Sequence, residues 1–144
     1  ILKKLLVFSG DIGIPIDLNW EKSYEGRTEH PKSEADNVLI DNGKITCIQK
    51  GIQNTLDNQV IGEFLGPIVL SEKGSEIFVE SYSKLQQIDK IPFHKASSLK
   101  TAYLTDMLQE LIDQGYLVEP IIIDGKWCEI DTLQDLDIAR KIFF

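Results

Sequence analysis

The chain of 144 residues is 42% hydrophobic and 26% charged, which is the balance of one ordinary globular domain with a real core. Its 23 acidic and 15 basic residues give a net charge of −8, which argues against nucleic acid or an anionic membrane as a partner. No apolar run approaches the roughly 20 residues of a membrane span, and residues 1–8 lack the features of a signal peptide. We therefore expect a cytoplasmic protein in which Cys47 and Cys128 are free thiols.

The first part of the chain predicts a helix end, one strand and a long loop. Residues 1–8 carry apolar side chains at helical spacing and stop before Gly10, as in the last turns of a helix. Because the chain begins inside this element and without methionine, we expect that an N-terminal part is missing. Residues 11–18 predict a strand in which Pro15 marks an edge or a bulge, and residues 19–36 predict a loop long enough to be functional.

The middle of the chain predicts a β-hairpin, a further strand and a helix. Asn42-Gly43 separates apolar runs at 38–41 and 44–48, and both residues tolerate the positive φ of a type I′ turn. Ser71 is expected to cap a helix that ends near residue 87. Residues 60–70 predict a strand that is broken where the backbone bends or approaches a neighbour closely, at Gly62, Gly66 and Pro67.

The last part of the chain predicts two helices around a second hairpin. Residues 99–114 form an amphipathic pattern with Gly115 just beyond its end. A buried strand at 117–123 is expected to turn at Asp124-Gly125 into a strand at 126–131. A capping box from Thr132 to Asp135 then begins a helix that continues to Lys141. The order of elements predicts an α/β fold with a mixed sheet.

Two carboxylates in the predicted strand at 126–131 suggest a metal site. Side chains alternate along a strand, so Glu129 and Asp131 would point to the same side. Carboxylates at the end of a strand are suitable ligands for Mg²⁺, which takes one or two of them together with substrate phosphates. The alternative is that both are solvated or that Asp131 merely caps the last helix.

Two motifs resemble known nucleotidyltransferases. The segment Trp127-Cys128-Glu129-Ile130-Asp131-Thr132, with the helix after it, is similar to the C-terminal signature of sugar-phosphate and phosphocholine nucleotidyltransferases. The segment Gly26-Arg27-Thr28-Glu29-His30-Pro31 resembles the nucleotidyltransferase domains associated with phosphoenolpyruvate phosphomutase, as do the segments around Glu63 and Asp106. The resemblance implies a Rossmann-like three-layer sandwich, of which residues 1–144 are the C-terminal portion of a single domain.

The resemblance implies Mg²⁺-dependent transfer of a nucleotidyl group, most simply from CTP, to a phosphonate or a phosphorylated small alcohol or amine. Glu129 and Asp131 become the catalytic metal ligands, and Arg27, His30, Glu63 and Asp106 become candidates for binding the acceptor. Each candidate has a structural alternative. Arg27 pairs with Glu29 or Glu34 within its own loop, Glu63 sits in a bulge, and Asp106 is a polar residue on an exposed helix face.

The glycine-rich triphosphate loop and the third metal carboxylate of the family are expected in an N-terminal half that these residues do not include. We therefore expect this chain to be inactive alone. It would act in a homodimer or in fusion with a phosphomutase. The rival hypothesis is a non-catalytic binding or assembly module with a degenerate nucleotidyltransferase fold, acting beside a phosphomutase of phosphonate biosynthesis.

Overall fold

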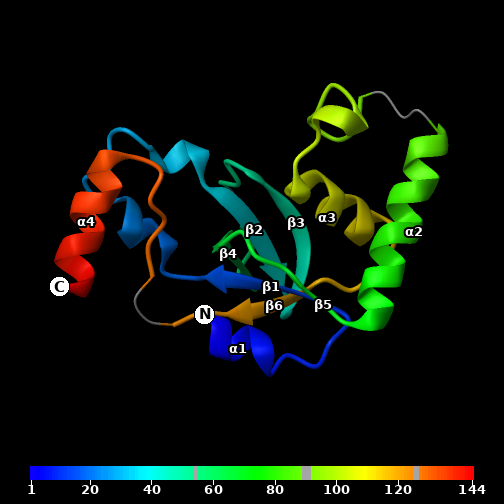
Figure 1. The fold of residues 1–144 in the computed structure, drawn as a ribbon, viewed down its shortest axis with the longest axis horizontal. Coiled ribbons are helices and arrows are strands. Elements are labelled where there is room, and N and C mark those ends of the chain that lie inside the picture. The colour runs from blue at the N-terminus through cyan, green and yellow to red at the C-terminus, as the bar shows by residue number, and fades with distance from the viewer. Residues whose placement is uncertain (54, 89–91, 125–126) are drawn as a thin grey trace.

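The computed structural model describes residues 1–53, 55–88, 92–124 and 127–144, and within them an open mixed sheet carries helices on both faces (Figure 1). The sheet has the order β3-β2-β4-β1-β5, and β6 pairs with β1 in parallel. This architecture confirms the predicted α/β class and is consistent with a Rossmann-like sandwich. The strands are β1 (Ile12–Asp17), β2 (Asp36–Asp41), β3 (Lys44–Lys50), β4 (Gln59–Phe64), β5 (Val69–Leu70) and β6 (Glu119–Ile122).

The helices divide between the two faces and one end of the sheet. Helices α2 (Glu72–Ile88) and α3 (Leu104–Asp113) pack against the side of β1 that carries Ile12, Ile14 and Ile16, which are all buried. The short α1 (Leu2–Leu6) packs on the other face against Ile121 and Ile123. Helix α4 (Leu133–Phe143) lies at the end of the sheet away from α2 (Figure 1). None of the described helices is long and apolar enough to cross a membrane.

Strand β1 is central, so Pro15 does not mark an edge; it lies where the ladder on one side of β1 is irregular. Pro15 is fully buried and lies opposite Ile121 of β6. On its other side, the partner strand changes from β4 to β5 just past Phe64, and the Pro15 carbonyl accepts a 3.1 Å hydrogen bond from Leu65 N. The N–H that proline lacks therefore falls where the neighbouring ladder is interrupted, and little is lost.

Three local predictions are confirmed. Asn42 and Gly43 have φ values of 49° and 78°, as a type I′ hairpin between β2 and β3 requires. The predicted strand at 60–70 is broken into β4 and β5 at Gly66, whose φ is 94°. Ser71 Oγ accepts a 2.9 Å hydrogen bond from Gly74 N and so caps α2.

Two other predictions need correction. The helix predicted at 99–114 begins only at Leu104, because the Asp106 carboxylate accepts a hydrogen bond from Tyr103 N and caps α3 there. Residues 99–101 form a separate 3₁₀ helix, η3 (Leu99–Thr101). The segment 127–131 is not a strand, so alternation does not determine where its side chains point. Gly125 and Lys126, where that hairpin was predicted to turn, lie outside the described residues.

Candidate functional site

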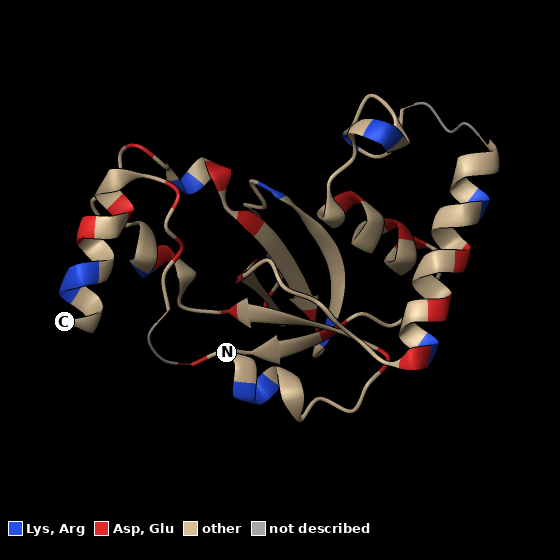
Figure 2. Cartoon of the chain, in the orientation of Figure 1, with Lys and Arg blue, Asp and Glu red and all other residues tan. Residues whose placement is uncertain are grey.

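Four segments that are distant in the sequence meet at the end of the sheet where β1 and β6 both terminate. They are the loop that follows the 3₁₀ helix η1 (Trp20–Tyr24), the end of β4, the segment 127–132 and the first turn of α4. The predicted long loop at 19–36 thus holds η1 and a second 3₁₀ helix, η2 (Lys32–Glu34). Figure 2 shows acidic residues along the segment that leads into α4. Carboxyl ends of parallel strands are the usual location of sites in open α/β sheets.

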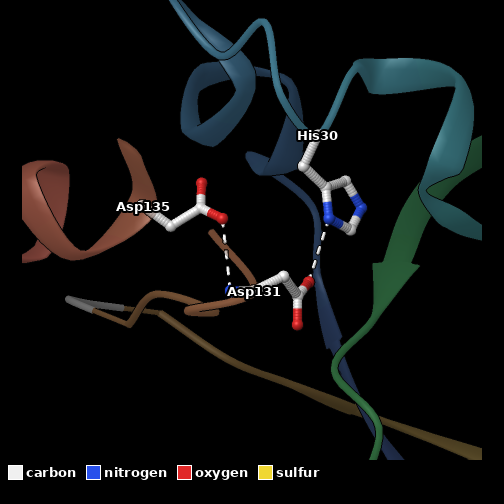
Figure 3. A group of neighbouring side chains, drawn as sticks. All are labelled: His30, Asp131 and Asp135. Atoms are coloured by element: carbon white, nitrogen blue, oxygen red, sulfur yellow. Dashed lines mark hydrogen bonds and ion pairs between the residues drawn. The ribbon is translucent and has the colours of Figure 1, made fainter. Parts of the chain in front are cut away.

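His30 and Asp131 face each other across this site (Figure 3). His30 Nδ1 lies 2.9 Å from Asp131 Oδ2, and about half of the Asp131 side chain is exposed. Glu129 belongs to the same group of charges. Loss of hydration first, and the nearby Asp131 carboxylate second, raise the pKa of Glu129, while His30 and Arg27 oppose that rise. The structure therefore brings Glu129, Asp131, His30 and Arg27 together.

The Arg27 side chain is buried and points towards α4. Its guanidinium carbon lies 4.7 Å from the centre of the Tyr24 ring, and its Nε lies 2.8 Å from Asp135 Oδ1. The alternative in which Arg27 pairs with Glu29 or Glu34 is wrong. The Nη2 atom of Arg27 is buried without a hydrogen-bond partner among the described residues, so this edge of the guanidinium is left for another group.

Asp135 holds together the start of α4 and the site. Its Oδ2 accepts hydrogen bonds from Thr132 N at 2.9 Å, from Thr132 Oγ1 at 2.8 Å and from Asp131 N at 3.2 Å. This confirms the predicted capping box from Thr132 to Asp135. Burial alone would raise the pKa of Asp135, but the hydrogen bonds from Thr132 and the contact with Arg27 outweigh it, and the pKa lies below its ordinary value.

A metal ion held by His30, Asp131 and Asp135 is geometrically conceivable, because one ligand atom from each lies within 4.8 Å of the others. However, both oxygens of Asp135 already have partners, Arg27 on one side and Thr132 with Asp131 N on the other. Mg²⁺ also prefers oxygen ligands to imidazole. This group of three therefore fits Mg²⁺ poorly.

Glu63 extends the site into the sheet. Glu63 is only 3% exposed. The Tyr24 hydroxyl donates a hydrogen bond to Oε1, while Oε2 is buried without a hydrogen-bond partner among the described residues. Burial raises the pKa of Glu63 to about 7, with Glu129 adding to the rise and Tyr24 opposing it. Glu63 pairs directly with Asp17 of β1 and with Asn37 of β2, so the three form a buried polar row.

Sequence reasoning missed Tyr24, Trp127, Asp17 and Asp135 as parts of the site. Trp127 Nε1 donates a 2.7 Å hydrogen bond to Asp17 Oδ2, which ties the segment 127–132 to the end of β1. A carboxylate at the end of an otherwise apolar strand was the available signal for Asp17. Asp135 was recognised only as a helix cap, because nothing local in the sequence shows that its second oxygen pairs with Arg27.

The structure does not place Asp106 with the other candidates. Its carboxylate accepts a 2.9 Å hydrogen bond from Tyr103 N, and it lines a cavity of about 790 Å³ with Asp36, Lys50 and His94. A smaller cavity, of about 90 Å³, lies at the cluster itself and is lined by Arg27, Trp127, Glu129 and Asp135 among others.

The fold and the clustered charges define an α/β protein with an acidic site at the carboxyl ends of two parallel strands. No model of a known protein family matches the sequence. The chain is 25% identical over 137 residues to the CTP:phosphoglutamine cytidylyltransferase of Campylobacter jejuni, an alignment that covers 95% of this chain and 52% of that protein. The chain thus spans about half the length of the curated relative it matches. It is a distant relative of a nucleotidyltransferase, which confirms the general relationship that the two motifs predicted.

Proposed function

We propose that this chain supplies the acceptor side and part of the metal site of a cytidylyltransferase. The enzyme transfers a cytidylyl group from CTP to a small phosphonate or to a phosphorylated alcohol or amine and releases pyrophosphate. The observation that carries the proposal is the meeting of Glu129 and Asp131 with Arg27 and His30 at one end of the sheet. The distant relationship to a cytidylyltransferase supports the choice of reaction and of nucleotide.

The carboxylates fit Mg²⁺ by their chemistry. Glu129 and Asp131 are close enough that the Asp131 charge raises the pKa of Glu129, and a cation bound by both would relieve this repulsion. When bound, Mg²⁺ supplies positive charge that neutralises the phosphates of the nucleotide. Asp135 is not a ligand in this proposal, because its oxygens hold Arg27 and the start of α4.

The basic residues bind and orient the acceptor. Arg27 has one buried edge without a partner, and His30 lies at the boundary between the loop and the carboxylates. An oxygen of the acceptor's phosphate or phosphonate attacks the α-phosphorus of CTP. The bond to the bridging oxygen breaks, and pyrophosphate leaves. Holding the acceptor in line with that bond is the main task of the protein in such a transfer.

The proposal is tested by measuring pyrophosphate release from CTP and Mg²⁺ by the full-length gene product, with a panel of phosphonates and phosphorylated alcohols. We expect turnover in the wild type and a loss of roughly 100-fold or more in Asp131→Ala, equivalent to about 2.7 kcal/mol of transition-state stabilisation. Asp137→Ala is the matched control, because Asp137 lies on the exposed side of α4 and pairs only with Arg140 among the contacts described.

A second measurement addresses the ligands directly. Binding of Mn²⁺, followed by electron paramagnetic resonance as a substitute for Mg²⁺, is expected to weaken in Glu129→Gln and in Asp131→Asn but not in Asp137→Asn. A folded protein with no turnover for any nucleotide and acceptor, and no difference in Mn²⁺ binding, would overturn the proposal and favour the non-catalytic binding module.

A further inference from the structure

Gln134, in the first turn of α4, uses its whole side-chain amide to hold the loop that carries Arg27 and His30. Its Oε1 accepts hydrogen bonds from Thr28 N at 2.8 Å and from Glu29 N at 3.2 Å. Its Nε2 donates to the Gly26 carbonyl at 3.2 Å and to Thr28 Oγ1 at 3.3 Å. These bonds join residues more than 100 positions apart, so they fix tertiary arrangement and not local structure.

The next residue, Asp135, continues the same connection towards the carboxylates. It pairs with Arg27 of the loop through one oxygen and binds Asp131 N and Thr132 through the other. His30 and Asp131 then face each other at 2.9 Å. The first turn of α4 therefore contacts the loop 26–30 on one side and the carboxylate segment on the other.

We propose that Gln134 is a positioning residue that holds the loop 26–30 so that Arg27 and His30 meet the anionic group of the acceptor in front of Glu129 and Asp131. This inference rests on the proposed function. Gly26 has a φ of 80°, and Thr28 and Glu29 are exposed, so the middle of the loop, between the buried Arg27 side chain and His30, has little packing of its own to keep it in place. Because Gln134 holds the loop in place before the acceptor binds, binding loses less conformational entropy of the loop.

The contacts of Gln134 lie at an exposed surface, where hydrogen bonds add little to stability. Its role should therefore appear in the recognition of the acceptor and not in the stability of the fold. The nucleotide is not expected to depend on Gln134, because this loop is assigned to the acceptor.

The test compares Gln134→Leu with Gln86→Leu, a matched control at an exposed glutamine of α2, in the full-length gene product. We expect Gln134→Leu to raise KM for the acceptor roughly tenfold, the equivalent of one well-placed anchor. KM for CTP and kcat should stay within about twofold of the wild type, and Tm should match that of the control. Gln134→Glu keeps an oxygen that can receive the hydrogen bonds from Thr28 N and Glu29 N, but it loses both bonds that Nε2 donates. Its KM for the acceptor substrate should therefore lie between those of the wild type and Gln134→Leu.

An equal rise of KM for acceptor and CTP, or an unchanged KM for the acceptor, would overturn the inference. Failure of the proposed function gives a different result, which is absence of turnover in the wild type itself. In that case the anchor is judged by hydrogen exchange in residues 26–30 with and without inorganic phosphate. Protection by phosphate in the wild type that disappears in Gln134→Leu supports it. Equal protection in both, or protection in neither, overturns it.

Discussion

Glu63 and Asp135 are two buried carboxylates in neighbouring parts of the same site, and their surroundings affect them in opposite directions. The two residues are 3% and 2% exposed. Glu63 receives one hydrogen bond, from Tyr24, and its other oxygen has no hydrogen-bond partner among the described residues. Asp135 receives hydrogen bonds from Thr132 and from Asp131 N, and it pairs with Arg27. The pKa is raised at Glu63 and lowered at Asp135.

The comparison shows that burial alone does not determine the state of a carboxyl group. Removing a carboxylate from water is unfavourable, but donors and a neighbouring cation compensate for it at Asp135. At Glu63 the compensation is incomplete, and the negative Glu129 adds to the penalty. The surroundings of Asp135 are therefore typical of a structural residue, whereas those of Glu63 are typical of a residue in a functional site.

The largest expected effect on stability comes from removing Asp135, the carboxylate that has an ion pair with Arg27. Asp135→Ala removes the cap of α4 and leaves the buried Arg27 guanidinium without its ion pair, so we expect a loss of about 3 kcal/mol in the free energy of unfolding. Urea unfolding at pH 7 measures it. Asp137→Ala, whose carboxylate pairs with Arg140 at the surface, should change this free energy by less than about 0.5 kcal/mol. Equal losses in the two variants would contradict the assignment of Asp135.

Removing the charge of Glu63 should have the opposite effect and increase the free energy of unfolding. The pKa of Glu63 is about 7 in the folded protein against an ordinary value of 4.5, so the unfolded chain loses this proton first as pH rises. The contribution of Glu63 to stability is complete below pH 4.5, falls between pH 4.5 and 7, and does not fall further above that range. We expect Glu63→Gln to be more stable than the wild type at pH 8 by on the order of 2 kcal/mol.

This difference between Glu63→Gln and the wild type should vanish near pH 4.5, where both side chains are neutral. Unfolding free energies measured from pH 4.5 to pH 8 check it. Glu25→Gln, at an exposed position of the neighbouring loop, is the control and should follow the wild-type profile. Parallel profiles for Glu63→Gln and the wild type would show that folding does not raise the pKa of Glu63.

The smallest effect on stability is expected at Asp131. About half of this side chain is exposed, and its contact with His30 is a surface pair. Asp131→Asn should change the free energy of unfolding by less than about 0.5 kcal/mol, although the proposed function gives this residue a large effect on turnover. Urea unfolding beside the turnover assay tests this separation. A loss comparable to that of Asp135→Ala would assign Asp131 to the structure of α4 instead.

The sequence alone determined the features that depend on residues within about four positions of one another. Asn42-Gly43 specifies its hairpin because both residues accept positive φ, and Ser71, Thr132 and Asp135 cap helices that begin beside them. It also placed Arg27, His30, Glu63, Glu129 and Asp131 among the candidates, through two motifs and the segment around Glu63, and the structure brings these five together.

Only the tertiary structure decided which of these residues contact one another and which stand apart. The pairing of Arg27 with Asp135, the anchoring of the loop by Gln134 and the bond from Trp127 to Asp17 each join positions more than 100 residues apart. Asp106 caps α3 and lines a different cavity from that of Arg27 and Glu129, which apolar periodicity does not reveal. Pro15 occupies a central strand because its neighbour changes from β4 to β5 there. Such contacts depend on how the elements pack, and no short stretch of sequence contains that information.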